Sequence, residues 1–230
     1  MTSRLDSLVI HWISADACLV IRGVRGCKDG LVGCEPEYIY DAIPSRVEEF
    51  TAGRSAARAA MQALGIPFNA VLQGAGGEPV WPDAICGSIS HTGAFAVAFV
   101  ARKDVYESVG VDIDDDRPIT DQIARDITWS TEVSRLLALG ICEDRSAAQN
   151  FAFSAKEAIY KCQYPRTLCR ALGFRQVRLV ERTGVRGSYL GASGWRVPTD
   201  VAAFLPWITV IPVRLAEHRI VCATYQRRIV

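Results

Sequence analysis

The chain has 230 residues, of which 50% are hydrophobic and 22% charged, and its formal net charge is +1 at pH 7. A chain of this length and composition can bury a core for one large domain or two small ones, which argues against wholesale disorder. The balanced charge gives no support to a protein that binds nucleic acid or an anionic membrane surface.

The eight cysteines are scattered along the chain, and no two of them form a C-x-x-C pair. The spacings typical of Cys and His zinc sites are therefore absent. The opening segment MTSRLDSLVI lacks the basic and long apolar regions of a secretory signal. No run reaches the roughly 18 apolar residues that a membrane span needs. These features predict reduced thiols in a cytoplasmic protein without a membrane segment.

The first half of the chain is predicted to combine several strands with one long helix. Two β-like runs, LVIHWI and ACLVIR, precede a glycine-containing loop. Apolar residues recur at helical spacing over residues 45–65, and Gly65 stands where a helix is expected to stop. The segment GAGGEPVWP is predicted to be a loop, and GSISHT and AFAVAFVAR to be two strands joined by a turn.

The second half opens with a short predicted strand, SVGVDI, which ends at an acidic cluster. Helices are predicted over residues 131–140, capped by Ser130 or Thr131, and over residues 146–165, ending before Pro165. The remainder is predicted to form strands separated by turns. Each half therefore mixes helices with strands, and we expect an α+β protein of two similar-sized lobes with a seam near residues 107–110.

The stretch GVDIDDD places four carboxylates within residues 112–116. Residues i and i+2 of a strand face the same side, so Asp112 and Asp114 can present two carboxylates to one point. Mg²⁺ is usually bound by one or two carboxylates together with water and substrate phosphates. A solvated acidic turn is the alternative, and it is favoured when this cluster is considered alone.

The segment FSAKEAIYK, residues 153–161, adds charged groups on a predicted helix. Glu157 and Lys161 are i,i+4 neighbours, and Lys156 lies beside them. One interpretation is a single surface ion pair that contributes little to stability. The other is a third carboxylate for the metal, with two cations for a phosphate.

Two further groups are suited to binding phosphate. Ser90 and His91 end a predicted strand before a glycine turn, although a structural role is more common for a lone histidine. Arg46 and Arg54 are eight residues apart on the predicted helix and so share a face. Two guanidinium groups on one face suit phosphate recognition, with solvated surface arginines as the alternative.

The joint order of these segments resembles the 4′-phosphopantetheinyl transferase superfamily. It is most similar to the larger monomeric class, which is associated with siderophore, nonribosomal peptide and polyketide assembly. The resemblance covers residues 35–175, and its most specific part is the G-x-D-x-(D/E) and K-E-x-x-x-K pair, separated by about 40 residues. The segments S-x-S-H-T, FTAGRSAARAAMQALG and GEPVWP add support.

The resemblance implies an enzyme that transfers the phosphopantetheine arm of coenzyme A to a serine of an apo acyl or peptidyl carrier protein. It implies a pseudo-twofold fold with the active site at the seam between two lobes. Residues 1–108 would hold the phosphate-binding helix and S-x-S-H-T, and residues 109–230 the metal and catalytic motifs. Mg²⁺ is the expected metal, with Mn²⁺ as the alternative. A monomer is expected, with neither nucleic acid nor membrane as a partner.

The same resemblance assigns roles to individual residues. Asp112, Asp114 and Glu157 are expected to bind the metal, and Glu157 to act as general base. The reaction releases adenosine 3′,5′-bisphosphate, and Lys161 is expected to neutralise this leaving group. Lys156 is expected to hold the diphosphate of coenzyme A. Coenzyme A contacts are assigned to residues of both halves, namely Arg46, Arg54, Gly76, Gly77, Glu78, Pro79, Ser90, His91, Asp112, Lys156 and Lys161.

Two departures from the usual pattern of the family concern these assignments. Asp114 stands where the family usually has Glu, so its shorter side chain could contact the metal through water or leave that role to Asp115 or Asp116. Otherwise Asp115 and Asp116 form a solvated edge. The loop before EPVWP often carries a basic residue, and here it is Gly76-Gly77. The missing phosphate contact is expected to affect coenzyme A affinity more than the chemistry.

Two alternatives are open for the activity. A Mg²⁺-dependent phosphohydrolase or nuclease would use the same carboxylates, but a nuclease normally has a basic track for the nucleic-acid backbone. A non-catalytic relative would bind coenzyme A or a carrier protein without transfer. Such a binding protein would not need a base beside the metal, so Lys156, Glu157 and Lys161 argue against it.

Overall fold

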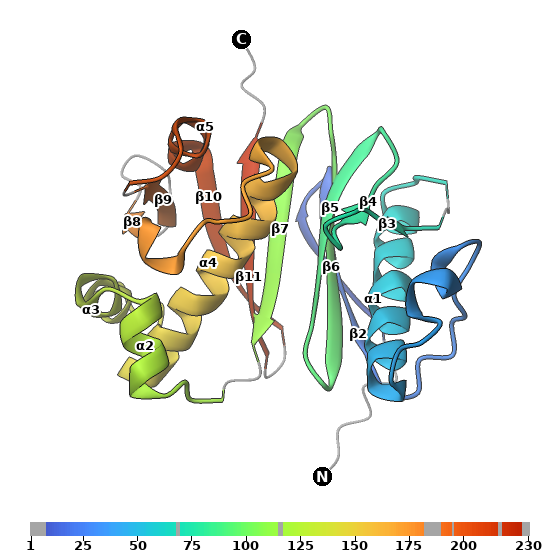
Figure 1. Cartoon of the computed structure of the whole chain (residues 1–230), viewed down its shortest axis with the longest axis horizontal. Helices are drawn as coiled ribbons and strands as arrows, with labels where there is room; N and C mark the ends of the chain where they lie inside the picture. Colours follow the sequence, from blue (N-terminus) through green and yellow to red (C-terminus); the bar gives the residue numbers. More distant parts are fainter. Residues whose placement is uncertain are drawn as a thin grey trace. The chain divides into compact units, whose positions relative to one another are not determined.

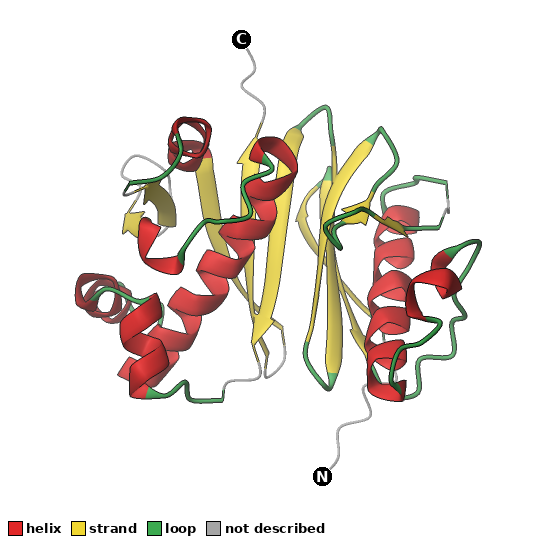
Figure 2. Ribbon diagram, viewed as in Figure 1, coloured by secondary structure: helices red, strands yellow, loops and turns green. Residues whose placement is uncertain are grey.

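The computed structural model describes residues 8–67, 70–114, 117–181, 190–194, 196–215 and 218–226. Within these residues the chain forms five α-helices, several short 3₁₀ helices and three β-sheets (Figures 1 and 2). This mixture confirms the predicted α+β class. The chain divides into two compact units, residues 1–107 and residues 108–230. No described helix is long and apolar enough to cross a membrane.

Unit 1 is built on an antiparallel sheet whose strands follow the order β1-β2-β6-β5. The strands are β1 (Val9–Ser14), β2 (Ala17–Gly23), β5 (Ile85–His91) and β6 (Phe95–Arg102). Helix α1 (Pro44–Ala63) packs against β6, β2 and β5 (Figure 1). The core between them combines alternate strand residues with the small side chains of one helix face, including Cys18, Val20, Ala98, Val100, Ala57, Ala60 and Met61.

The ends of α1 agree with the sequence signals. Pro44 occupies the first turn, where its missing N–H group is tolerated. Gly65 follows the helix with a φ of +69° and donates its N–H to the Gln62 carbonyl. The 3₁₀ helix η1 (Glu35–Ile39) precedes α1 and packs against it.

A small hairpin corrects the prediction that GAGGEPVWP is entirely loop. Strands β3 (Leu72–Gln73) and β4 (Pro79–Val80) pair in antiparallel register, and the Gly74 N–H group donates to the Glu78 carbonyl. Gly77, with a φ of +87°, forms the tight turn that a residue with a side chain rarely adopts. The strands were missed because they are too short for alternation to be visible.

Unit 2 contains a five-stranded sheet in the order β7-β11-β10-β9-β8. Its strands are β7 (Tyr106–Asp114), β8 (Val177–Glu181), β9 (Leu190–Gly194), β10 (Ile208–Leu215) and β11 (His218–Gln226), with β7 beginning at the end of unit 1. Helix α4 (Arg145–Thr167) packs on β11 and β10. The smaller elements are α2 (Asp121–Ile127), α3 (Ser130–Ala138), α5 (Thr199–Phe204), η2 (Phe174–Gln176) and η3 (Leu205–Trp207).

Two predicted helix ends in unit 2 are wrong. Helix α4 continues through Pro165 to Thr167, which is possible because proline in the last turn removes only one hydrogen bond of the helix. Helix α3 has Trp129 as its N-cap residue rather than Ser130 or Thr131. The Glu132 carboxylate accepts the Trp129 N–H at 2.8 Å, so an acidic side chain three residues on stabilises this start.

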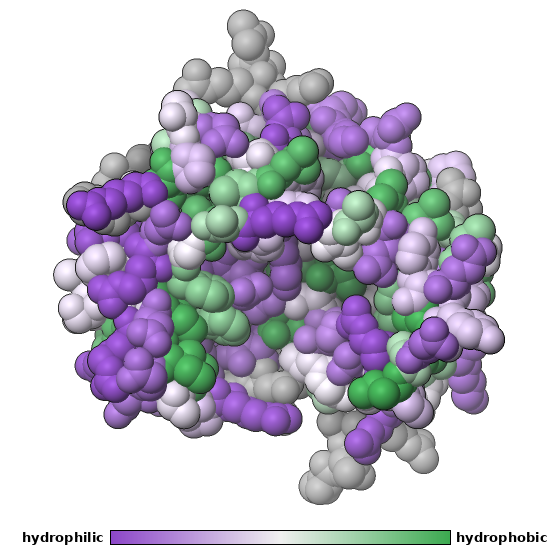
Figure 3. All heavy atoms as spheres, viewed as in Figure 1, coloured by the Kyte–Doolittle hydropathy of each residue, from purple (hydrophilic) through white to green (hydrophobic). Residues whose placement is uncertain are grey.

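The surface is predominantly polar on the face shown in Figure 3, with hydrophobic residues present as separate patches. Exposed hydrophobic side chains include Tyr40 and Ile43, which lie between η1 and the start of α1. Isolated exposed hydrophobic residues are normal on a folded protein, so this pattern does not by itself define a binding surface.

Candidate functional site

In unit 2, strand β7 approaches helix α4 so closely that their backbones touch. A Cβ atom added to Gly110 would collide with the Ala158 carbonyl and lie 2.7 Å from the Cys162 nitrogen. The Ser108 hydroxyl donates to the Cys162 carbonyl at 2.5 Å. Glycine is therefore required at position 110 for the acidic end of β7 to reach α4.

This approach joins Asp112 of β7 to Lys161 of α4. Lys161 Nζ donates to Asp112 Oδ1 at 2.7 Å and to the Val111 carbonyl at 3.1 Å. Glu157 lies one helical turn before Lys161. Burial raises the pKa of Glu157, the Lys161 charge lowers it, and the Asp112 charge raises it further. Two carboxylates and one ammonium group therefore meet at one place in unit 2.

Asp112 and Glu157 fit the ligand preferences of a magnesium ion. Two neighbouring, partly buried carboxylates repel each other, and a divalent cation removes that repulsion. Oxygen ligands from one or two carboxylates are what Mg²⁺ normally takes from a protein. Within the described residues, no group of three or more His, Cys, Asp or Glu side chains is arranged to hold a metal. Asp114 as a third ligand stays a prediction, and Asp115 and Asp116 lie outside the described residues.

The side chain of Lys156 is buried and contacts residues of α2 and α3. It is 2% exposed, and its Nζ donates to Glu132 Oε2 at 2.9 Å and to the Ile127 carbonyl at 2.8 Å. Burial lowers the pKa of Lys156, and the Glu132 charge raises it. These contacts fasten α4 to α3 and to the end of α2. The predicted contact of Lys156 with the diphosphate has no support in this geometry and stays a prediction.

Glu132 is a functional candidate that the sequence reasoning missed. Its two carboxylate oxygens accept three hydrogen bonds, from Lys156 Nζ, from the Trp129 N–H and from the Leu179 N–H at 2.9 Å. Glu132 thus links α3, α4 and β8. Its partner on α4, Lys156, directly precedes Glu157. The position of Glu132 three residues after a helix start was a visible signal for a capping glutamate, but its partner on α4 was not.

In unit 1, Arg46, His91 and Glu49 form a chain of polar contacts. Arg46 Nη1 lies 2.8 Å from His91 Nε2, and His91 Nδ1 lies 3.4 Å from Glu49 Oε2. A guanidinium group can only donate, so His91 Nε2 is the acceptor and the ring carries its proton on Nδ1. The structure thus brings Arg46 and His91 into direct contact, and their binding of coenzyme A stays a prediction.

Arg54 lies deeper in the same region of unit 1. It is 5% exposed, its guanidinium carbon lies 4.2 Å from the centre of the Phe50 ring, and its Nε has no hydrogen-bond partner among the described residues. Burial lowers the pKa of Arg54 to about 10, and the nearby Arg46 charge lowers it as well, whereas the Glu35 charge raises it. A buried cation with an unpartnered N–H group is a natural binding point for an anion.

Ser90 and the hairpin loop complete the predicted residues of unit 1. Ser90 is buried near the end of β5, beside His91. Gly76 and Gly77 are exposed, Glu78 and Pro79 are half-buried, and the ring of Trp81 packs on Gly87 of β5. Glu78 Oε2 is buried without a hydrogen-bond partner among the described residues. The hairpin is thus anchored by Trp81, and its adenine contact stays a prediction.

Two family models match this chain. The 4′-phosphopantetheinyl transferase N-terminal domain matches residues 35–101, and the 4′-phosphopantetheinyl transferase superfamily matches residues 108–197. The first range contains the Arg46, Arg54 and His91 cluster, and the second contains Asp112, Glu157 and Lys161. Together the ranges cover more than half of the chain. The chain belongs to the 4′-phosphopantetheinyl transferase superfamily, which confirms the resemblance found in the sequence.

Individual relatives are about one third identical to this chain over the segments that match. It is 35% identical over 133 residues to 4′-phosphopantetheinyl transferase Svp of Streptomyces mobaraensis, covering 58% of this chain and 54% of the relative. It is 33% identical over 156 residues to 4′-phosphopantetheinyl transferase PptT of Mycobacterium tuberculosis, covering 66% of each. It is 37% identical over 123 residues to enterobactin synthase component D of Escherichia coli K12, covering 50% of this chain and 54% of the relative. The matched parts thus span between about half and two thirds of these relatives.

Proposed function

We propose that this chain transfers the 4′-phosphopantetheine arm of coenzyme A to a serine hydroxyl of apo acyl or peptidyl carrier proteins, with Mg²⁺ bound. The observation that carries the proposal is the meeting of Asp112, Glu157 and Lys161 at the contact between β7 and α4. The names of the relatives support the same reaction class. One group of them, enterobactin synthase component D, favours siderophore, nonribosomal peptide or polyketide assembly as the setting.

The reaction replaces a phosphoanhydride bond of the diphosphate by a phosphoester bond to serine. The serine oxygen attacks the phosphorus that carries the pantetheine arm, and a new O–P bond forms. The bond from that phosphorus to the bridging oxygen of the diphosphate breaks, and adenosine 3′,5′-bisphosphate leaves. Catalysis of such a transfer depends mainly on positioning and charge neutralisation, because the phosphoryl group itself needs little covalent assistance.

Glu157 accepts the proton of the serine hydroxyl in this proposal. Burial and the Asp112 charge raise its pKa, so the carboxylate holds a proton more strongly than an exposed glutamate does. Asp112 and Glu157, with Asp114 as the third carboxylate, would hold Mg²⁺, which neutralises charge on the diphosphate when bound. Lys161, which contacts Asp112 and the Val111 carbonyl, would neutralise the departing bisphosphate.

The arginines of unit 1 bind the 3′-phosphate of coenzyme A in this proposal. Arg54 supplies a buried guanidinium whose Nε lacks a described partner, and Arg46 and His91 supply donors at the surface. Ser90 assists through its hydroxyl, and residues 76–79 line the adenine pocket. Binding of the phosphate would stabilise charges that repel one another in the free protein, which gives the interaction its driving force.

The test is the intact mass of an apo carrier protein after incubation with this protein, coenzyme A and MgCl₂. We expect a gain of one phosphopantetheine, which EDTA abolishes and which a Glu157→Gln variant does not produce. Release of free phosphate without modification of the carrier would instead identify a phosphohydrolase. Binding of coenzyme A without any mass gain on several unrelated carriers would identify a non-catalytic relative.

A further inference from the structure

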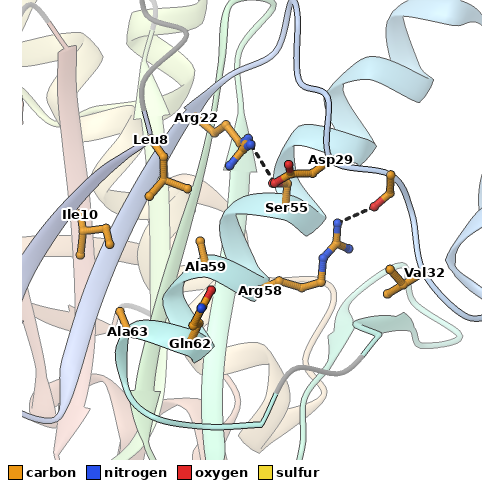
Figure 4. A pocket seen from close by; sticks show the side chains of 11 residues that line it. Leu8, Ile10, Arg22, Asp29, Val32, Ser55, Arg58, Ala59, Gln62 and Ala63 are labelled. Atoms are coloured by element: carbon orange, nitrogen blue, oxygen red, sulfur yellow. Dashed lines mark hydrogen bonds and ion pairs between the residues drawn. The ribbon is translucent and has the colours of Figure 1, made fainter.

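The short helix η1 is fastened to α1 by a buried ion pair. Arg58 Nη1 donates to Glu35 Oε2 at 2.6 Å, and Arg58 Nη2 donates to the Gly30 carbonyl at 2.7 Å. Figure 4 shows Arg58 reaching from α1 to this carbonyl at the edge of a pocket in unit 1. Glu35 is fully buried and also accepts the N–H groups of Val32 and Val71. The position of η1 along α1 is therefore fixed.

This anchor sets which other side chains of η1 and α1 meet. In a 3₁₀ helix residues i and i+3 are aligned, so Tyr38 lies on the same face as Glu35, roughly 6 Å further along. On α1, Arg54 lies one turn before Arg58, also roughly 6 Å away on the same face. Glu35 meets Arg58, and the chain then has to return along the helix to the start of α1 at Pro44. The helix η1 therefore runs against the direction of α1, which brings Tyr38 towards Arg54.

The charges around Arg54 agree with this arrangement. Burial is the largest effect and lowers the pKa of Arg54, whereas the Glu35 carboxylate and the Tyr38 hydroxyl raise it. Tyr38 is 39% exposed, so its ring is partly covered while part of it still faces water. The guanidinium and the phenol thus border the same small region of unit 1.

We propose that Tyr38 is a further phosphate-binding residue of this site, and that its O–H group donates a hydrogen bond to the 3′-phosphate of coenzyme A held by Arg54. The identity of the phosphate rests on the function proposed above. The buried Nε of Arg54 and the partly exposed hydroxyl of Tyr38 give one charged and one neutral donor for a single phosphate. Tyr38 therefore favours coenzyme A over 3′-dephospho-coenzyme A.

The test compares Tyr38→Phe with Tyr40→Phe, using both coenzyme A and 3′-dephospho-coenzyme A with one apo carrier protein. Phenylalanine keeps the ring and removes only the hydroxyl, and Tyr40 is a matched control because it is 89% exposed two residues away. For Tyr38→Phe we expect kcat/KM with coenzyme A to fall about tenfold, mainly through KM, as for one lost hydrogen bond to a charged group. The loss with 3′-dephospho-coenzyme A is expected to be far smaller, and Tyr40→Phe to resemble the unmodified protein with both substrates.

Two outcomes would overturn the proposal. An equal loss with both substrates would mean that the hydroxyl acts on the structure rather than on the phosphate, and no loss with coenzyme A would remove Tyr38 from the site. If the unmodified protein transfers nothing, the proposed function fails, but the phosphate contact can still be measured. Tyr38→Phe and the unmodified protein should then be compared by calorimetric titration with adenosine 3′,5′-bisphosphate and with adenosine 5′-monophosphate. The variant should bind the bisphosphate more weakly and the monophosphate as well as the unmodified protein does.

Discussion

Replacement of Arg54 by methionine is expected to stabilise the free protein while weakening its binding of coenzyme A. Burial lowers the pKa of Arg54 from its ordinary value to about 10. At about 1.4 kcal/mol per pH unit, folding therefore disfavours the charged guanidinium by roughly 3 kcal/mol. The penalty is present at every pH below about 10 and is relieved only as the pH rises from there towards the ordinary pKa of arginine.

Methionine keeps an apolar chain of similar length over the Phe50 ring and removes the charge. The lost cation–π contact offsets about 1 kcal/mol of the gain. We therefore expect the free energy of unfolding at pH 7 to rise by about 2 kcal/mol, measured by urea unfolding of the free protein. In the transfer assay the KM for coenzyme A should rise at least tenfold, as for a lost charge-assisted hydrogen bond to phosphate, with a smaller change in kcat.

Arg58→Met is the matched control, because Arg58 is a buried arginine of the same helix that has a carboxylate partner. Its removal leaves Glu35 buried and uncompensated, which is expected to lower the free energy of unfolding by about 3 kcal/mol or more. If Arg54→Met destabilises the protein as Arg58→Met does, Arg54 has a structural partner and the reasoning is wrong. If Arg54→Met is stabilising but leaves the KM for coenzyme A unchanged, Arg54 does not belong to the binding site.

Three further substitutions test the contacts of α4 with β7 and with α3. Glu157→Gln should abolish transfer and raise the thermal midpoint of the metal-free protein, with Mg²⁺ no longer raising that midpoint. The reason is that folding raises the pKa of Glu157, so its stabilising contribution is present at low pH and is lost as the pH rises through the folded-state pKa. Gly110→Ala should lower the free energy of unfolding by about 3 kcal/mol or more and abolish transfer. Gly30→Ala is the control, because no atom lies within 4 Å of the added Cβ, and it should fold normally in the same thermal assay. Lys156→Met should lower the free energy of unfolding by about 3 kcal/mol, because it leaves the buried Glu132 unpaired. A raised KM for coenzyme A in the folded variant would support the predicted diphosphate contact. An unchanged KM would leave Lys156 a purely structural role.

The sequence was sufficient for the class of fold and for most of the long elements. The predicted helix over residues 45–65 agrees with α1 because proline, periodicity and glycine all act locally. Pro165 misled the prediction for α4, since its tolerance depends on how near it lies to the helix end. The hairpin of β3 and β4 was missed because its strands contain two residues each, too few for a periodic pattern.

The candidate site was partly predictable, because local spacing along a strand or helix also determines which of its side chains share a face. Strand parity and helical spacing indicate which charged residues of each element share a face. The contact between Asp112 and Lys161 was not predicted, because it depends on the close approach at Gly110. Arg46 and Arg54 were expected to share a face, but only the tertiary structure leaves one at the surface and buries the other. The Glu132 partner of Lys156 lies on another helix, and no local pattern of residues 153–161 indicates it.

Paired and unpaired buried charges distinguish the structural contacts of this chain from its proposed binding site. Arg58 and Lys156 are each matched by a buried carboxylate, so their charges are compensated in the free protein and hold helices in place. Arg54 has a buried nitrogen without a described partner, and Glu157 has a raised pKa beside a second carboxylate. The free protein bears these costs, and a phosphate or a divalent cation would relieve them. Folding stability is thus lost at the positions where ligand binding gains it, so a substitution that stabilises the protein at Arg54 or Glu157 should also weaken its function.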